Sequence, residues 1–203
     1  MLKGDADILV WLSPKMAKFL RQDGRYFVSY WPTDFYTALF FNCESPLFRD
    51  KALRKAVSKG INRDRIIEKL LTGGGAKIQG PMPAKIFHTE NIGSLNYNPR
   101  EAASLLRDAG WKDSDGDGLL EKKGEKLWFR LYYRAEIVEF IKIADLIAQD
   151  LFEIGIGVET VPVQIGEFAS RNTESGDYDA ILEAKTSYDD INAQTWSSSS
   201  IYN

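Results

Sequence analysis

Strand-like and helix-like segments alternate along the second half of this 203-residue chain, and this alternation is the strongest constraint on its fold. An aromatic run at 127–133 predicts a strand, and apolar residues at helical spacing across 136–154 predict the longest helix. The segments 158–163 and 178–182 have the composition of strands, and 167–174 between them favours a short helix. A strand-helix-strand-helix-strand order is typical of an α/β fold.

The first half of the chain predicts two more strands and a pair of helices. The segments 26–30 and 37–42 are short and rich in aromatic residues, which favours strands. A helical pattern begins at Asp50 and is broken at Gly60. Asn62 is then placed to cap a second helix with its own apolar face.

The run from Asn98 to Trp111 combines several signals for one short amphipathic helix. Asn98 can cap the helix, Pro99 suits its first position and Gly110 can end it. Its apolar stripe consists of Ala102, Leu105, Leu106 and Ala109. An acidic, glycine-containing turn at 113–118 follows at once.

Composition sets limits on the class of protein. Hydrophobic residues make up 44% of the chain, which is enough for a substantial core in one domain or one large lobe. The formal charge is -3 with both signs scattered, so a nucleic-acid partner, which needs a concentrated basic face, is not expected. Cys43 stands alone, which excludes an internal disulfide and leaves the compartment open. We expect no membrane span and no export signal within these residues.

The acidic turn resembles the first half of a calcium-binding loop. Asp113, Asp115 and Asp117 alternate so that their carboxylates can point at one centre, and Gly118 permits a sharp bend. Position twelve of such a loop, where a bidentate glutamate closes the site, is Gly124. We therefore favour a solvated turn that connects a helix to a strand, with calcium binding as the alternative.

No set of residues in the sequence predicts catalysis. His88 is the only histidine, and it lies in a predicted loop without an acid–base partner at a recognisable spacing. The sequence also contains no nucleophile elbow, phosphate-binding loop or Cys/His metal cluster. We therefore expect neither an enzyme nor a cofactor.

Arg134 is the strongest candidate for binding a ligand. It directly follows the aromatic strand, where a guanidinium can grip a carboxylate through two parallel hydrogen bonds, as a peptide C-terminus would require. The alternative is a solvated arginine at the end of a strand. Aromatic side chains at strand ends or in loops can stack on a ligand, and Trp31, Tyr133, Tyr188 and Trp196 are candidates for this role.

Several short motifs occur in one characteristic order along the chain. They are Gly4–Ile8; Phe41-Asn42 with Pro46, Asp50, Leu53-Arg54, Ala56-Val57 and Ile61-Asn62-Arg63; Gly80–Pro83; Asn98–Gly110; Glu153–Ile156; and Gly176–Asp179. Together they resemble the extracytoplasmic solute-binding proteins of family 5, the oligopeptide- and dipeptide-binding components of ABC importers. The resemblance extends from Gly4 to about Asn192.

The resemblance implies a mixed-sheet lobe of a periplasmic-binding-protein-like fold of the type II, peptide-binding class. In whole family members the Gly4–Ile8 motif lies deep in the sequence, near the passage from the first lobe to the second. We therefore expect residues 1–203 to form one partial lobe, corresponding to the second, C-terminal ligand-binding lobe. Residues 1–35 are then expected near the inter-lobe crossover.

The resemblance also implies a function. It predicts a substrate-binding component that holds a peptide or a similar small solute between two lobes and delivers it to an ABC permease in the membrane. Such a receptor works outside the cytoplasm, as a monomer, and without a cofactor. The alternative is a calcium-stabilised interaction module, or an α/β enzyme with an unrecognised site.

By similarity to dipeptide-binding proteins, Arg134 falls where an arginine meets the carboxylate of the ligand. At the other end of the ligand, Lys185 stands where the family has a tryptophan, and Tyr188 lies near the position of an acid that pairs with the amino group. Asp189 or Asp190 can supply that acid after a shift of one residue. These departures leave room for another solute, such as a sugar or a metal chelate.

Overall fold

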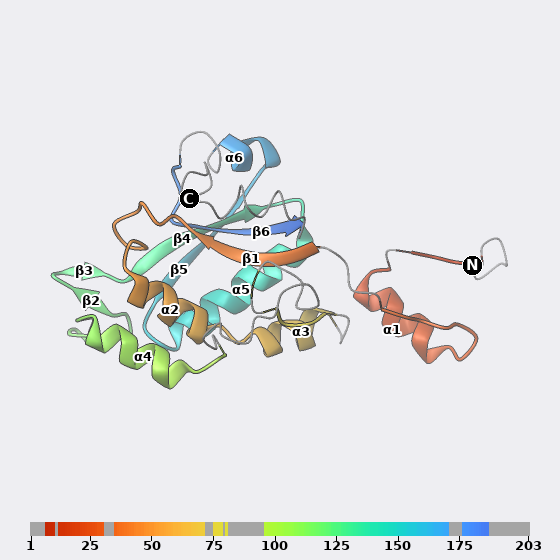
Figure 1. The fold of residues 1–203 in the computed structure, drawn as a ribbon, viewed down its shortest axis with the longest axis horizontal. Coiled ribbons are helices and arrows are strands. Elements are labelled where there is room, and N and C mark those ends of the chain that lie inside the picture. Colours follow the sequence, from red (N-terminus) through yellow and green to blue (C-terminus); the bar gives the residue numbers. More distant parts are fainter. Residues whose placement is uncertain are drawn as a thin grey trace.

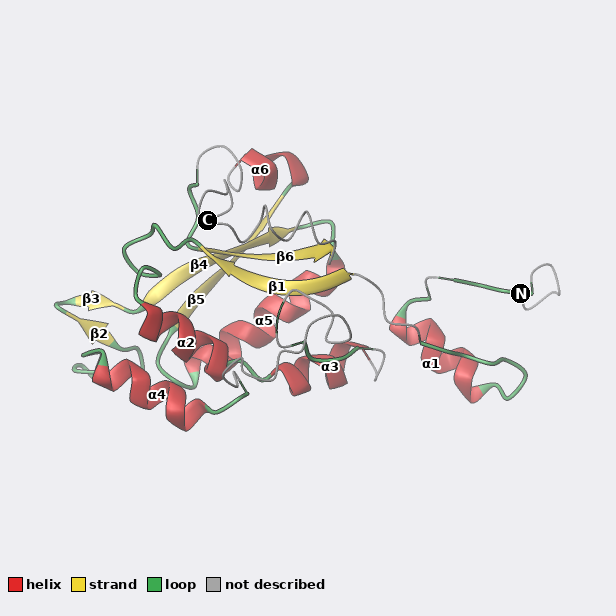
Figure 2. Cartoon of the chain, viewed as in Figure 1, coloured by secondary structure: helices red, strands yellow, loops and turns green. Residues whose placement is uncertain are grey.

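A mixed four-stranded sheet organises the chain in a computed structural model, which describes residues 7–10, 12–30, 35–71, 75–78, 80, 96–170 and 176–186. Figures 1 and 2 show the arrangement of its elements. The helices are α1 (Pro14–Gln22), α2 (Lys51–Gly60), α3 (Arg63–Leu71), α4 (Pro99–Asp108), α5 (Val138–Phe152) and α6 (Ile165–Ala169). The strands are β1 (Phe35–Phe41), β2 (Glu121–Lys122), β3 (Glu125–Lys126), β4 (Trp128–Arg134), β5 (Gly157–Val163) and β6 (Ala180–Thr186).

The strand order of the main sheet is β1-β6-β4-β5. The two neighbours of β4, which are β5 and β6, both run parallel to it, and β1 pairs with β6 in the antiparallel direction. The predicted strand-helix-strand-helix-strand order is confirmed as β4-α5-β5-α6-β6, and so is the α/β class with a mixed sheet. None of the helices in the described ranges combines the length and apolar composition that a membrane crossing requires.

Two apolar clusters lie on opposite faces of this sheet. The main core joins alternate residues of β4, namely Phe129, Leu131 and Tyr133, to residues of α2, α4 and α5. A smaller cluster on the other face joins Tyr132 of β4 to Phe168 of α6 and to residues of β5 and β6. Figure 2 shows α2 and α5 on one side of the sheet and α6 on the other. This two-sided covering explains why β4 has buried apolar residues on both faces.

Local capping signals fix the helices that the sequence predicted. The Asp50 side chain accepts a hydrogen bond of 2.8 Å from the Ala52 amide at the start of α2. At the start of α4, the Asn98 side chain accepts a hydrogen bond of 3.1 Å from the Glu101 amide. Gly110 follows α4 with a φ of +88°, a backbone conformation that glycine adopts without strain. These predicted helices are confirmed.

The strand expected at residues 26–30 is wrong. This segment has no regular secondary structure, and the Phe27 side chain is 94% exposed. Aromatic composition favours a strand only where a neighbouring strand completes the hydrogen bonds, and the described residues provide none here. The helix α1 was not expected, although Ser13 and Pro14 give it a cap and a suitable first residue.

A small hairpin between the acidic turn and β4 was also not expected. Strands β2 and β3 pair through Glu121 with Lys126 and Lys122 with Glu125. The connecting residues Lys123 and Gly124 have φ angles of 58° and 83°, as a tight hairpin turn with two left-handed residues requires. The predicted elements elsewhere have different boundaries: α6 begins at Ile165, and β6 continues to Thr186.

A buried carboxylate ties the α2–α3 junction to α5. Asp150 is 3% exposed, and its Oδ2 accepts a hydrogen bond of 2.9 Å from the Asn62 amide. Its Oδ1 lies 2.6 Å from Nη2 of Arg65, which also donates to the Leu146 carbonyl oxygen at 3.2 Å. Burial raises the pKa of the Asp150 carboxyl, whereas the Asn62 amide and the Arg65 charge oppose that rise.

Substituting a fully buried residue of α4 should lower the stability of the fold. Leu106 has no exposed surface in the main core, so Leu106→Ala is expected to reduce the free energy of unfolding by about 2–5 kcal/mol. Leu105 packs against the same core but is only partly buried, so the matched Leu105→Ala control should cost about 1 kcal/mol. Urea denaturation of both variants checks the difference, and equal costs would contradict this placement of α4.

The raised pKa of Asp150 should make stability depend on pH. A carboxyl that binds its proton more tightly when folded stabilises the protein below the ordinary value of 3.8, and that contribution is lost as pH rises through the folded pKa. The stability of the wild type should therefore fall relative to Asp150→Asn as pH rises from that value. Denaturation at several pH values tests this, with the exposed Asp145→Asn on the same helix as the control. A constant difference between wild type and Asp150→Asn would contradict the expectation.

Candidate functional site

Charged side chains gather on the α6 face of the sheet, where β4 and β6 end. The parallel register pairs Tyr133 with Leu182, so the next residues, Arg134 and Glu183, lie level on neighbouring strands. Side chains alternate between the two faces of a strand, so Lys185 shares the face of Glu183. We call Arg134, Glu183 and Lys185 the strand-end cluster.

The central contact of the strand-end cluster is an ion pair between Arg134 and Glu183. Nη2 of Arg134 lies 3.5 Å from Oε1 of Glu183, and the two side chains are 27% and 11% exposed. This separation is longer than the about 2.7–2.9 Å of a charge-assisted hydrogen bond. Nε of Arg134 is buried and has no hydrogen-bond partner among the residues that the structure describes. The guanidinium is therefore held beside Glu183 by charge, and not all of its donors are used.

Backbone and side-chain contacts fix the strand end that carries Arg134. The Ala135 amide donates to the Val163 carbonyl oxygen at 2.9 Å, which continues the pairing of β4 with β5. Glu136 Oε1 accepts a hydrogen bond of 3.0 Å from the Ile165 amide at the start of α6. The end of β4 that carries the guanidinium is therefore fixed by contacts with β5 and α6. A strand end held in this way can present a cation to the carboxylate of a ligand.

Two of the predicted ligand-binding residues, Lys185 and Tyr133, lie on opposite faces of the sheet. Lys185 is half-buried on the same face as Arg134, which agrees with a shared site. Tyr133 is 3% exposed and packs in the main core on the opposite face, where burial raises the pKa of its phenol. The Tyr133 side chain therefore has almost no surface to offer a solute.

The other predicted contacts cannot be placed. Trp31, Tyr188, Asp189 and Asp190 lie outside the described residues, as do Trp196, His88 and most of the loop at 80–83. Their roles stay predictions. Sequence reasoning missed Glu183, because its closeness to Arg134 depends on the pairing of two strands that are far apart in the sequence. The only local signal was a charge that alternates with apolar residues in β6.

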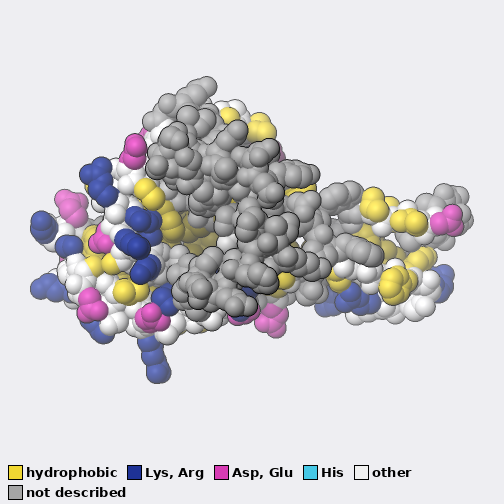
Figure 3. All heavy atoms as spheres, in the orientation of Figure 1, with side chains coloured by type: hydrophobic (Ala, Val, Ile, Leu, Met, Phe, Trp, Pro, Cys, Tyr) yellow, Lys and Arg dark blue, Asp and Glu magenta, His cyan; other side chains and the backbone are white. Residues whose placement is uncertain are grey.

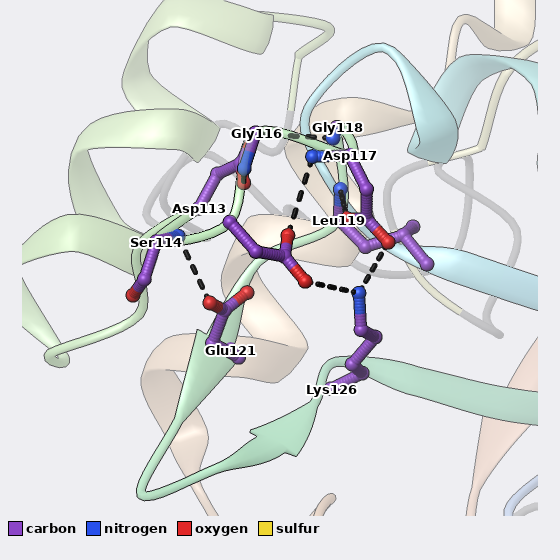
Figure 4. Close-up of polar contacts among 9 residues, drawn as sticks. Asp113, Ser114, Gly116, Asp117, Gly118, Leu119, Glu121 and Lys126 are labelled. Atoms are coloured by element: carbon purple, nitrogen blue, oxygen red, sulfur yellow. Dashed lines mark hydrogen bonds and ion pairs between the residues drawn. The ribbon is translucent and has the colours of Figure 1, made fainter.

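The acidic turn is occupied by a side chain of the protein itself. The carboxylates of Asp113, Asp115 and Asp117 lie within 4.8 Å of one another and are exposed. Lys126 Nζ lies 3.0 Å from Asp115 Oδ2. It also contacts Asp117 Oδ2, as Figure 4 shows. The Lys126 hydrogen bond lowers the pKa of the Asp117 carboxyl and holds it ionised. An ammonium group therefore contacts two of the three carboxylates and offsets part of their negative charge.

Further hydrogen bonds make this turn a connector between α4 and the β2–β3 hairpin. Asp113 accepts hydrogen bonds from the amides of Gly116 at 2.7 Å and Gly118 at 3.1 Å. Glu121 in β2 accepts a hydrogen bond of 2.9 Å from the Ser114 amide, which Figure 4 also shows. These contacts agree with the structural interpretation that we favoured for the sequence.

Comparison with known proteins gives consistent matches over nearly the whole chain. The family model described as bacterial extracellular solute-binding proteins, family 5 Middle, matches residues 1–201. The oligopeptide-binding protein AppA of Bacillus subtilis is 30% identical over 151 residues, which cover 72% of this chain and 28% of AppA. A probable ABC transporter periplasmic-binding protein of Escherichia coli, SapA, is 26% identical over 183 residues, covering 90% of this chain and 32% of SapA.

Solved structures agree with these sequence matches. AppA from Bacillus subtilis in complex with a nonapeptide superposes with a TM-score of 0.71 and 28% identity, covering 76% of this chain and 32% of AppA. NikZ from Campylobacter jejuni in complex with Ni(L-His) has a TM-score of 0.77 and 21% identity, covering 92% of this chain and 38% of NikZ, which supports the fold alone. The chain spans about a third of the length of the curated relatives named above.

We expect the acidic turn to keep its structure without calcium, because Lys126 already pairs with two of its carboxylates. The wild type should melt at the same temperature in excess EDTA and in millimolar calcium. Lys126→Met should lower the melting temperature at low salt, because Asp115 and Asp117 then repel each other without a cation. The exposed Lys123→Met in the same hairpin is the control and should change little.

The effect of Lys126→Met should also depend on pH. A carboxyl with a lowered folded pKa stabilises the protein above its ordinary value, and this contribution is lost as pH falls through the folded pKa. The difference between Lys126→Met and the wild type should therefore vanish in acid. A higher melting temperature of the wild type in calcium would overturn the structural interpretation.

Proposed function

The chain belongs to the bacterial extracellular solute-binding proteins of family 5, and on this premise we propose that it forms a ligand-binding lobe of the substrate-binding component of an ABC importer. The component holds a peptide or a similar small solute in a cleft between two lobes. It then delivers this solute to a permease in the membrane. The similarity to AppA, an oligopeptide-binding protein that was solved with a nonapeptide, supports a peptide as the solute.

The observation that carries the proposal is the unused donor of Arg134. The Arg134 side chain is 27% exposed, lies 3.5 Å from Glu183 and has no hydrogen-bond partner for Nε among the described residues, so its guanidinium keeps donor capacity for a carboxylate. It lies where parallel strands end, which is the edge at which α/β sheets bind ligands. Arg134 therefore binds the carboxylate of the solute, and Lys185 adds a second positive charge on the same face.

Further ligand contacts in this proposal come from the family resemblance. Tyr188 and either Asp189 or Asp190 bind the amino end of the solute, and Trp31 stacks on its surface. An acid that faces an ammonium group in a closed cleft adds specificity for that end of a peptide. Tyr133 supports the sheet beneath Arg134 and does not itself line the cleft, because it is almost fully buried.

Exposed apolar residues near the N-terminus support the proposed division into lobes. The side chains of Ile8, Phe19 and Phe27 are 82%, 55% and 94% exposed. Figure 1 shows α1 away from the sheet, and Figure 3 shows hydrophobic atoms on the surface of this part of the chain. Large exposed apolar surfaces usually contact another part of a protein. This exposure supports our proposal that residues 1–35 adjoin the inter-lobe crossover. The family resemblance supports the other part, in which residues 1–203 form one partial lobe, the second, C-terminal one.

The remaining features of the proposal also follow from the family. The component works by binding without bond chemistry, as a monomer, outside the cytoplasm, and without a cofactor or a nucleic-acid partner. The calcium-stabilised module is not pursued, because Lys126 faces the carboxylates of the acidic turn.

The proposal is tested by replacing the guanidinium of Arg134, which should weaken the recognition of a carboxylate. Arg134→Lys keeps the charge but not the two parallel donors, so the intact receptor should bind a peptide with a free carboxylate about tenfold or more weakly. Binding of the C-terminal amide of that peptide should change little. Calorimetry measures both affinities, and Arg130→Lys is the control because Arg130 lies on the same face of β4 but pairs with Asp179. Equal effects of both substitutions, or no effect of Arg134→Lys, would contradict the proposed role.

One lobe offers only half a cleft, so we expect the 203-residue chain alone to bind the same peptide too weakly for calorimetry. Nuclear magnetic resonance detects such weak binding through the Nε–H signal of Arg134. This signal should move when the free-carboxylate peptide is added and should stay in place with the amide. Micromolar or tighter binding by this chain alone would contradict the division into two lobes.

A further inference from the structure

The protein places a carboxylate of its own beside the guanidinium that is proposed to bind the carboxylate of the solute. Glu183 Oε1 lies 3.5 Å from Nη2 of Arg134. The carboxylate of Glu183 and that of a solute would therefore share one positive group. Like charges at such a site repel each other, so the two carboxylates compete.

We propose that Glu183 is a specificity-determining residue that competes with the solute for Arg134 and thereby limits the affinity for carboxylates. This inference rests on the proposed function and deepens it, because it concerns the same site. It assigns a role to Glu183, which forms an ion pair with Arg134 and directly follows the core residue Leu182 in β6.

Glu183 cannot easily leave the guanidinium. Strand β6 lies between β1 and β4, with Glu183 opposite Ala38 of β1. Its Oε1 accepts a hydrogen bond of 2.9 Å from the Ala184 amide, and only 11% of its side chain is exposed. A carboxylate held in this way stays near Arg134 when a solute arrives, so its repulsion acts on the bound solute as well.

The charges of Arg134 and Glu183 offset each other. Their side chains are only 27% and 11% exposed, so solvent screens this pair incompletely. A solute carboxylate therefore meets a guanidinium whose charge is already partly neutralised by Glu183.

The ion pair with Glu183 does not use all donors of the guanidinium. Glu183 faces Nη2 at 3.5 Å, and Nε has no hydrogen-bond partner within the described part of the chain. The ion pair therefore orients Arg134 without using all of its donors. A solute carboxylate that approaches the exposed part of the guanidinium still lies close enough to Glu183 to be repelled.

The experiment removes the negative charge of Glu183 and keeps the shape of its side chain. Glu183→Gln leaves an oxygen that can accept from Arg134 but removes the negative charge. The probes are alanine tripeptide and its C-terminal amide, which differ only in the carboxylate, titrated by calorimetry into the intact receptor. We expect the variant to bind the tripeptide about tenfold more tightly than the wild type and the amide with unchanged affinity.

Glu159→Gln is the matched control. Glu159 is an exposed residue of β5 in register with Arg130, four residues before Arg134 on β4. The same chemical change at this more distant place should leave both affinities unchanged. In a double variant that also carries Arg134→Lys, Glu183→Gln should raise the affinity for the tripeptide much less. The guanidinium for which Glu183 and the solute compete is then absent.

The results separate this inference from the proposed function. If Arg134→Lys weakens tripeptide binding but Glu183→Gln leaves the preference for tripeptide over amide unchanged or reduces it, the role of Glu183 is overturned. If Arg134→Lys has no effect, the proposed function itself fails. Absence of tripeptide binding in both the wild type and Glu183→Gln also overturns the inference. Should Glu183→Gln fail to fold, Glu183→Asp withdraws the charge by one methylene, and a smaller gain in the same direction is then expected.

Discussion

The register between β4 and its two parallel neighbours is the constraint on which the rest of the structure depends. Seven residue pairs join β4 to β5, and three join β4 to β6. Because side chains alternate along β4, this pairing sends Leu131 into the main core and Tyr132 into the smaller cluster. A slip of one residue would turn Arg134 into the core and expose Tyr133. The burial of the apolar residues therefore also determines where the guanidinium points.

Local signals made much of the fold predictable. The helices that begin after Asp50 and Asn98 carry their caps in the sequence itself, so their starts depend on only a few neighbouring residues. The error at 26–30 has the opposite origin, because strand formation depends on a partner that composition does not reveal. The hairpin at Lys123 and Gly124 was also missed, because its residues were interpreted as the continuation of an acidic turn.

The candidate site was only partly predictable. Arg134 could be found from its position at the end of an aromatic strand, whereas Glu183 comes close to it only through the pairing of β6 with β4. Tyr133 was chosen for the same strand end, but it shares a face with Phe129 and Leu131 and is therefore a core residue. The alternation along β4 contained this information. Trp31, Tyr188, Asp189 and Asp190 stay predictions because they lie outside the described residues.

The ion pair at Asp150 affects how firmly helix α3 is attached to the rest of the fold. Helix α3 has no fully buried residue, so little apolar surface holds it to the sheet. Beside the partly buried Ile66, its attachment rests on the Asn62 amide and on Arg65, which both contact the carboxylate of Asp150. An element attached by polar contacts opens at a lower free energy than one anchored in a core. We therefore expect the backbone amides of helix α3 to exchange with solvent before those of the sheet, and local opening there to precede global unfolding.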